Sequence, residues 1–304
     1  MQTEALTPAR LKESPLAVPP LARNADLSLN KEANDALIQH IERSGVNMLL
    51  YGGNAIFYHI ALSEFESVLT YLAEAAGDDT LVIPSVGPSF GMMMDQAKIL
   101  KGTDYPTVMV LPQKDITTAD GIERGVRMFA DAYGKPVVLY VKQEGTLEVP
   151  NVRRLFDDGL VSSIKYAIVR EDTSKDEYLS RLVDEVDPNY IFSGIGEQPA
   201  IIHLRDFGLG GFTSGCICVA PGLSLKLMKT IQAGDWDAAE AIRETFEPLE
   251  DLRNEINPIR VLHEAVTLAG IGDMGDVLPL LSSISDADKT RVGQAAKALL
   301  EQNV

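Results

Sequence analysis

Cysteine is nearly absent from this chain, which holds only Cys216 and Cys218 among 304 residues. Two cysteines exclude a framework of several disulfides. Without further Cys, a structural zinc site built from four Cys and His ligands cannot be read from the sequence either. The pair lies two residues apart in one short apolar stretch. We therefore expect reduced, packed thiols, as in proteins of the cytosol.

Positive charge and long apolar runs are also scarce. The 27 Lys and Arg residues face 44 Asp and Glu residues, which gives a net charge of −17. This balance argues against nucleic-acid and anionic-membrane partners, because both need a basic face. No apolar run approaches the roughly 20 residues that span a bilayer, and residues 1–18 lack the continuous apolar stretch of a signal peptide. We expect a cytoplasmic protein with neither partner, although a site can still gather positive groups around an anionic small molecule.

Short apolar runs alternate with longer amphipathic segments along most of the chain. The alternation favours parallel β/α units, and eight such units close a TIM barrel. An open doubly wound sheet is the alternative, but Gly52 and Gly53 lack the rest of the glycine-rich turn that it would carry. We therefore predict an α/β fold of the TIM (β/α)8 barrel type. The predicted strands are residues 15–18, 47–51, 80–86, 107–111, 136–141, 161–164, 190–193 and 211–214.

The predicted helices carry apolar residues at spacings of three and four. Ser63 and Ser174 each precede a glutamate by three residues, which predicts two capping boxes. Gly134 predicts the end of the helix before it. The helices expected between the strands are residues 31–43, 63–76, 92–101, 119–133, 151–157, 174–186 and 198–207.

After Gly215 the pattern predicts helices alone, and there are too many for one barrel unit. They cover residues 223–233, 236–253, 259–269 and 287–301. We predict a barrel in residues 1–222 and a C-terminal helical subdomain, residues 223–304, packed on it.

Lys165, at the end of the apolar run 161–164, is the most informative residue of the sequence. An ammonium group at the end of a buried strand must be paired, solvated by a cavity, or kept neutral. Tyr140 and Lys142 share one face of the preceding strand because side chains alternate along a strand. The carboxyl ends of barrel strands form the active sites of TIM barrels. Tyr140 and Lys165 are therefore expected to reach one substrate.

A neutral lysine amine forms a Schiff base with a keto acid, and a nearby phenol can relay protons. Ordinary structural roles compete with this interpretation. Lys165 can pair with Glu171 or Asp172, and Tyr140 can simply fill the barrel. Lys142 can be a solvated loop cation, and Asn54 a turn residue beside the two glycines.

The order of these residues resembles the dihydrodipicolinate synthase / N-acetylneuraminate lyase family. Tyr140 ends the fifth strand and Lys165 the sixth, as in that family. Further similar stretches are residues 83–87 (IPSVG) in the third strand, Ser193 and Gly194 in the seventh, and residues 208–214 (GLGGFTS) in the eighth with Pro221 after them. The resemblance runs from about residue 14 to the last helices.

The resemblance implies a lyase that acts on pyruvate or another 2-keto acid through a Schiff base on Lys165, with Tyr140 as the proton relay. It also implies that no metal or organic cofactor is needed, and that the chain forms a homotetramer or homodimer. By the same resemblance, the residues expected to bind the substrate are Gly52, Gly53, Asn54, Lys142, Ser193 and Gly194.

The sequence departs from the family pattern near the second strand. The usual G-x-T-G-E stretch is replaced by GGNAIF at residues 52–57, so the Thr is missing and Ile56 stands for the Glu. The tyrosine after strand four and the arginine loop after strand five are also missing. These departures argue against authentic dihydrodipicolinate synthase. The glycine pair, the Leu111-Pro112 loop and Lys142 are more similar to the branch that dehydrates 5-dehydro-4-deoxyglucarate.

We therefore expect a class I aldolase or dehydratase of a 2-keto acid or keto-deoxy sugar acid. A non-catalytic family member that binds a keto acid is one alternative, suggested by the altered second-strand loop. A barrel enzyme without a Schiff base, in which Lys165 is structural, is another.

Overall fold

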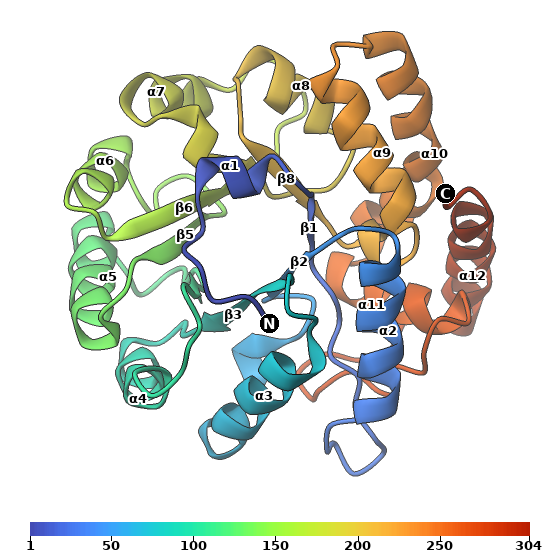
Figure 1. Cartoon of the computed structure of the whole chain (residues 1–304), viewed down its shortest axis with the longest axis horizontal. Helices are drawn as coiled ribbons and strands as arrows, with labels where there is room; N and C mark the ends of the chain where they lie inside the picture. Colours follow the sequence, from blue (N-terminus) through green and yellow to red (C-terminus); the bar gives the residue numbers. More distant parts are fainter.

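A computed structural model describes all 304 residues, and its centre is a closed barrel of eight parallel strands. The strands follow the chain order around the barrel, and the eighth pairs with the first. The predicted (β/α)8 barrel is confirmed (Figure 1), and the open doubly wound sheet is wrong because the sheet has no free edge. The strands are β1 Leu16–Ala17, β2 Met48–Tyr51, β3 Leu81–Val86, β4 Met109–Val110, β5 Val137–Val141, β6 Val161–Tyr166, β7 Ile191–Ser193 and β8 Gly211–Ser214.

The pairing of β5 with β6 sets the position of the predicted catalytic residues. Tyr140 lies directly opposite Lys165 in this pair, and Lys165 in turn lies opposite Phe192 of β7. Residues of both strands are buried almost throughout, because one face of each fills the barrel and the other packs beneath helices. The phenol and the amine therefore leave neighbouring strands at the same height.

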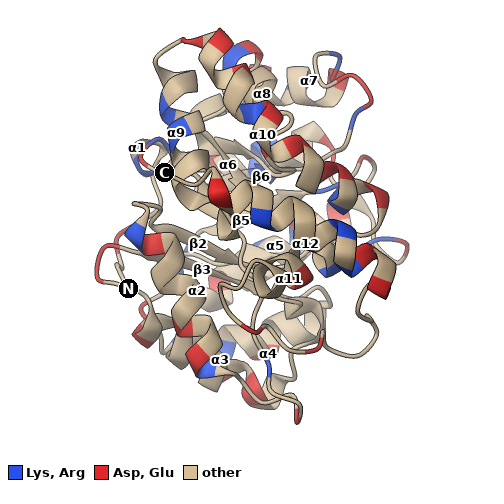
Figure 2. Ribbon diagram, turned by 90° about the vertical axis from the view of Figure 1, so that its right-hand side faces the viewer, with Lys and Arg blue, Asp and Glu red and all other residues tan.

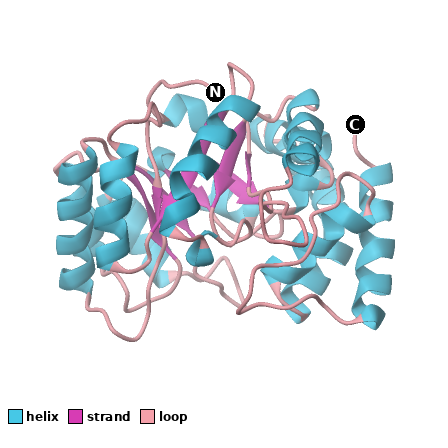
Figure 3. Cartoon of the chain, turned by 90° about the horizontal axis from the view of Figure 1, so that it is seen from below, coloured by secondary structure: helices cyan, strands magenta, loops and turns pink.

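Helices form a ring around the strands (Figure 1) and flank them on both sides in Figure 3. A short helix, α1 (Pro8–Leu11), precedes β1, and short 3₁₀ turns are η1 (Phe57–His59), η2 (Pro188–Tyr190) and η3 (Cys216–Cys218). The outer ring consists of α2 Lys31–Arg43, α3 Leu62–Ala75, α4 Phe90–Leu100, α5 Ala119–Tyr133, α6 Val149–Asp157, α7 Glu177–Glu185, α8 Ala200–Asp206 and α9 Pro221–Gln232.

Both predicted capping boxes are misplaced. Helix α3 begins at Leu62, and the Glu64 carboxylate accepts a hydrogen bond from the backbone N–H of Ala61, so Ser63 lies inside the first turn. Helix α7 is capped by Asp176, which accepts from the backbone N–H of Leu179. In both helices a carboxylate outside the predicted pair bonds to the backbone at the helix start, which the serine spacing alone did not reveal. The stop at Gly134 is confirmed, since this residue has a left-handed φ of 84°.

Three further helices follow, α10 (Trp236–Glu255), α11 (Pro258–Leu268) and α12 (Asp286–Glu301); α10 packs against α9, and α11 and α12 pack against α10 and against each other. They enclose a second apolar core that includes Phe246, Val261 and Val292, together with Leu223 of α9. Other residues of α9, such as Leu227, belong to the main barrel core. Helix α9 thus contributes to both cores, and the boundary at residue 222 stays a prediction.

The molecular surface carries charges of both signs. Figure 2 shows basic and acidic residues interspersed on the outer helices. Arg243 on α10 pairs with Glu240 and Glu247, and Arg291 of α12 pairs with Glu255 at the end of α10. No helix has both the length and the apolar content to cross a membrane.

Candidate active site

A cavity of about 680 Å³ opens at the carboxyl ends of the strands. Its wall includes Tyr140 and Lys165, and it extends to residues of α10 and α11. A second cavity, of about 700 Å³, lies between α4, α5 and the loop 112–118. Tyr140 is the one predicted site residue in the wall of that second cavity, which lacks Lys165. The first cavity is therefore the candidate site.

Lys165 is 6% exposed, and its Nζ lies 4.7 Å from the centre of the Tyr140 ring. No carboxylate lies within salt-bridge distance of this amine. Asp172 pairs instead with Lys175, and Lys165 forms no ion pair with Glu171 either, so the alternative role of Lys165 as the partner of one of these carboxylates is wrong. Burial, followed by the positive charges of Lys142 and Arg253, lowers the pKa of Lys165 to about 7. A large fraction of this amine is therefore neutral at neutral pH.

Tyr140 remains a protonated phenol over the physiological range. Burial raises its pKa to about 12, with a smaller opposing effect of the Arg253 charge. The hydroxyl forms no hydrogen bond with another protein group and lines the cavity. It is therefore free to donate to, or accept from, a molecule bound beside Lys165.

The loop after β2 brings two of its three predicted residues to the cavity. Gly53 and Asn54 line the wall, and the Asn54 amide donates to the Val18 carbonyl over 2.9 Å. Gly52 does not line it. A Cβ on Gly52 would come within 2.6 Å of the Met109 side chain, so this glycine permits close packing beneath the loop.

Ile56, which replaces the usual family glutamate, packs away from the cavity. It adopts a left-handed φ of 56°, uncommon for a β-branched residue, and is buried with Val277 and Leu278. The backbone N–H of Phe57 donates to the carbonyl of Gly52 and closes the turn. Apolar packing and backbone hydrogen bonds, rather than a carboxylate, therefore fix this loop.

The two residues predicted to bind substrate at the end of β7 occupy different environments. Gly194 lines the cavity, and a Cβ there would meet the Lys165 Cγ at 2.9 Å and the Tyr166 carbonyl oxygen at 2.8 Å. Ser193 is fully buried outside the wall, with its hydroxyl 2.8 Å from Nδ1 of His203. Of the predicted set, the cavity wall brings together Lys165, Tyr140, Lys142, Gly53, Asn54 and Gly194.

Sequence reasoning missed Arg253, which reaches the cavity wall from α10. Its Nη1 donates to the Ile195 carbonyl and to Glu250, over 3.0 and 3.1 Å. Arg253 was missed because the prediction considered only the ends of strands, and this residue lies on a helix that follows the barrel. A usable signal exists, since Glu250 lies four residues after Phe246 on the apolar face of the helix, where a charge needs a partner.

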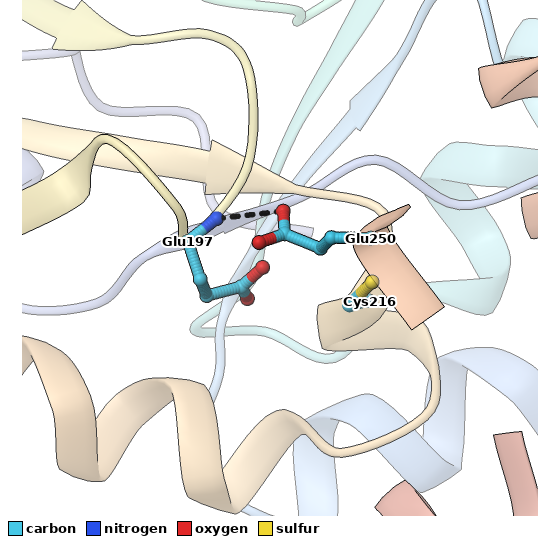
Figure 4. Close-up of side chains that lie close together, drawn as sticks. All are labelled: Glu197, Cys216 and Glu250. Carbon is cyan, nitrogen blue, oxygen red and sulfur yellow. Dashed lines mark hydrogen bonds between the residues drawn. The ribbon is translucent and has the colours of Figure 1, made fainter. Parts of the chain in front are cut away.

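Glu250 holds the backbone of the loop between β7 and α8. One carboxylate oxygen accepts from the N–H of Glu197 over 3.0 Å (Figure 4), and the other accepts from the N–H of Gln198 over 2.9 Å. Gly196, with a φ of 103°, leaves room for this carboxylate, because a Cβ there would overlap it. Helix α10 thereby fixes the loop that follows Gly194.

Glu197, Cys216 and Glu250 lie close enough together to suggest a metal site. Burial raises the pKa of both carboxyls and of the Cys216 thiol. Of the two carboxyls, Glu250 is the better placed to ionise, since both its oxygens accept N–H groups and Arg253 lies beside it, whereas one oxygen of Glu197 has no partner and fits the neutral form. A protonated thiol, a neutral carboxyl and an already saturated carboxylate do not fit a metal ion. The cluster therefore holds backbone rather than an ion.

Residues 16–299 match the model of the family described as the dihydrodipicolinate synthetase family. A probable 5-dehydro-4-deoxyglucarate dehydratase of Streptomyces avermitilis is 21% identical over 99% of this chain and 100% of its own length. A 4-hydroxy-tetrahydrodipicolinate synthase of Staphylococcus carnosus is 26% identical over 62% of each chain.

Solved structures share the fold. Dihydrodipicolinate synthase from Bacillus clausii superposes with a TM-score of 0.84 and 22% identity, covering 95% of this chain and 98% of that one. Sialic acid aldolase from Ruminococcus gnavus gives a TM-score of 0.82 at 18% identity with the same coverage.

Proposed function

We propose that this chain, which belongs to the dihydrodipicolinate synthetase family, is a lyase that forms a Schiff base between Lys165 and a 2-keto acid. The observation that carries the proposal is the state of the Lys165 amine. It is buried, has no carboxylate partner, lines a cavity and has a pKa lowered to about 7. A structural lysine would be paired, and a simple binding site needs no neutral amine.

The chemistry follows from this neutral amine. Its lone pair adds to the C2 carbonyl, and the resulting carbinolamine loses its hydroxyl as water to give an iminium ion. The iminium withdraws electrons from C3. A C–H bond or a carbon–carbon bond at C3 can therefore break. The phenol of Tyr140, opposite Lys165 across the β5–β6 pair, donates a proton to the departing hydroxyl, which leaves as water, and the resulting phenolate takes a proton back when C3 is deprotonated.

The substrate carboxylate is assigned to the loop after β2. Gly53 exposes its backbone there, and Asn54 is held beside it by the hydrogen bond to Val18. Gly194, which lies against the Lys165 side chain, gives the keto carbon room to approach Nζ. Ser193 and Gly52 support the wall from behind.

The reaction is an aldol cleavage, an aldol condensation or the dehydration of a keto-deoxy sugar acid. Dehydration of the 5-dehydro-4-deoxyglucarate type is the specific candidate, because the Streptomyces avermitilis relative aligns along the whole chain. We still expect the chain to form a homotetramer or homodimer, and we expect it in the cytoplasm.

The proposal is tested by trapping the Schiff base. The protein is incubated with pyruvate and sodium borohydride, and its mass is measured. Reduction of the imine should add about 72 Da once per chain, and peptide mapping should locate the adduct on Lys165. Lys165→Ala should abolish the adduct, whereas Lys175→Ala, at an exposed lysine paired with Asp172, should retain it.

Absence of an adduct with pyruvate and with longer 2-keto acids would overturn the assignment. An adduct on another lysine would overturn the role of Lys165. A trapped adduct without turnover of any keto-deoxy acid would leave a binding protein, the alternative suggested by the altered β2 loop.

A further inference from the structure

We propose that the loop between β6 and α7, residues 167–176, is a lid over the candidate active site, and that the ion pair of Arg170 with Glu144 holds this lid closed. The inference goes beyond the proposed function, because it concerns how a molecule enters and leaves the cavity. It relies on that function in one of its two tests, in which the adduct on Lys165 reports on the bound molecule.

The lid lies at the mouth of the cavity. Its residues in the cavity wall are Ala167, Val169, Arg170, Glu171 and Thr173. The side chain of Val169 is nevertheless 76% exposed to solvent. A segment that belongs to the wall and also faces the solvent separates the cavity from the surrounding water.

Few hydrogen bonds hold the middle of the lid. Its first residue is fixed to the sheet, since the backbone N–H of Ala167 donates to the Val141 carbonyl over 2.8 Å, and its last residue, Asp176, caps α7. Between these ends, the hydrogen bonds and ion pairs of residues 171–175 stay within that stretch. Arg170 alone connects the middle of the lid with other parts of the molecule. A segment with so few bonds opens locally at low cost.

The inner contact of Arg170 is buried. Its Nη2 donates to Oδ1 of Asp176 over 3.0 Å, and the side chain of Asp176 has no exposed surface. Asp176 also accepts hydrogen bonds from the Tyr166 hydroxyl and from the backbone N–H of Leu179. Loss of Arg170 would leave this buried carboxylate without its counter-charge, which is costly. We therefore expect Arg170 to stay bound to Asp176 in both the closed and the open lid.

The outer contact of Arg170 is exposed. The same Nη2 donates to Glu144, whose side chain is 56% exposed. Water can replace an exposed partner, and salt screens an exposed ion pair. Of the two contacts of this guanidinium, the one with Glu144 therefore breaks more easily, and its loss releases the lid.

The ion pair closes the mouth of the cavity above the reactive groups. Glu144 lies in the loop after β5 and Arg170 in the loop after β6. These two strands carry Tyr140 and Lys165 opposite each other. A closed lid at this place limits the access of bulk water to an iminium on Lys165, which water would hydrolyse.

Limited proteolysis measures the opening of the lid, because cleavage requires a locally open segment. The protein is treated with subtilisin, and mass spectrometry follows cleavage within residues 169–175. Glu144→Gln keeps the shape of the side chain and removes its charge, so it should raise the cleavage rate about fivefold, the order of effect that an exposed ion pair supplies. Glu185→Gln is the matched control, since Glu185 is also 56% exposed and pairs with Arg153. This change should leave the rate unaltered.

The dependence on salt links the effect to the ion pair. The cleavage rate of the wild-type protein should rise with sodium chloride toward that of Glu144→Gln, whereas the rate of the variant should stay constant. Each rate is divided by that of a free peptide of the same sequence, which corrects for the response of the protease to salt.

Release of bound pyruvate provides the second test. The protein is equilibrated with isotopically labelled pyruvate and diluted into excess unlabelled pyruvate, and borohydride then fixes the label that remains on Lys165 at successive times. Water must reach the iminium and pyruvate must leave, and both pass the lid. Glu144→Gln should therefore release the label about fivefold faster, with the half-saturating concentration for trapping changed less than about twofold, because a lid controls entry and exit alike.

An unchanged cleavage rate in Glu144→Gln would overturn the role of the ion pair. Faster cleavage with unchanged release of pyruvate would overturn the position of the lid on the route to Lys165. Faster release with unchanged entry would raise the half-saturating concentration in proportion, and would show that Glu144 supports the bound ligand rather than the lid. Absence of any adduct on Lys165 would overturn the proposed function, and the proteolysis would still decide whether the ion pair holds the loop.

Discussion

The burial that keeps the amine of Lys165 largely neutral also lowers the stability of the protein. A pKa of about 7 in the folded chain, against about 10.4 for an exposed lysine, corresponds to roughly 5 kcal/mol of unfavourable free energy. The unfolded chain binds the proton over this whole interval and the folded chain does not. The penalty is therefore full below pH 7, declines as the pH rises, and vanishes above the unfolded pKa.

Replacement of Lys165 by methionine should stabilise the fold. We expect Lys165→Met to raise the free energy of unfolding by a few kcal/mol at pH 6.5, and by clearly less at pH 9.5. Urea denaturation at the two pH values measures both differences. Lys175→Met, at an exposed position, should change stability little at either pH. A gain that is independent of pH would show that the amine is not the source of the penalty.

The rate of Schiff-base trapping should follow the neutral fraction of Lys165. We expect it to rise about tenfold per pH unit below pH 7 and to level off above that value. Tyr140, with a pKa of about 12, should produce no decline up to pH 10. Stopped trapping reactions with pyruvate between pH 5.5 and 10 give the profile.

Lys142→Gln provides the control for this profile. Its positive charge lowers the pKa of Lys165, so its removal should move the midpoint of the profile to higher pH. An unchanged midpoint would contradict the electrostatic coupling between the two lysines.

At the scale of elements, helix α10 completes a site that the strands begin. Glu250 accepts two backbone N–H groups of the β7–α8 loop, and Arg253 contacts the Ile195 carbonyl. Strands could be predicted from sequence because alternation of apolar runs and helical spacing is a local signal. The contact between residues 197 and 250 depends on packing across the molecule, and no local pattern reports it.

The same distinction between local and long-range signals explains which residue positions could be predicted from the sequence. The opposition of Tyr140 and Lys165 could be predicted because side-chain alternation and strand order determine it. The placement of Ser193 behind the wall, beside His203, depends on where β7 ends, which the sequence gives only approximately. Asp176 displaced Ser174 as a helix cap because both are capping residues and only the folded loop selects between them.

Glu250→Gln should strongly lower the free energy of unfolding. The amide group presents an NH₂ to a backbone N–H and leaves Arg253 without its counter-charge, so we expect a loss of about 3 kcal/mol. Chemical denaturation measures this loss, and trapping with pyruvate should slow in parallel as the loop beside Gly194 loosens. Glu247→Gln, on the same helix at a partly exposed pair with Arg243, should cost less than about 1 kcal/mol.

Glu197→Gln tests which of the two buried carboxyls is ionised. Since Glu197 is assigned the neutral form, an amide of the same shape should be tolerated far better there than at position 250. Equal losses at the two positions would contradict the assignment of the ionised state to Glu250.

At the scale of the whole molecule, both cysteines report on global unfolding. Cys216 and Cys218 are buried, and burial raises the pKa of both thiols. We expect no reaction of the native protein with a thiol-specific disulfide reagent at pH 8, and two reactive groups per chain in guanidinium. A native thiol that reacts at once would indicate that the segment after β8 opens independently of the barrel.

The contact of Glu250 and Arg253 with the β7–α8 loop also has a consequence for the order of events during synthesis. A chain leaves the ribosome from its N-terminus, so all eight strands emerge before α10 does. Through that interval the barrel sequence is complete while its loop at residues 195–198 lacks the helix that holds it. The cavity wall at this loop can therefore reach its final form only after α10 has emerged, well after the strands are available to pair.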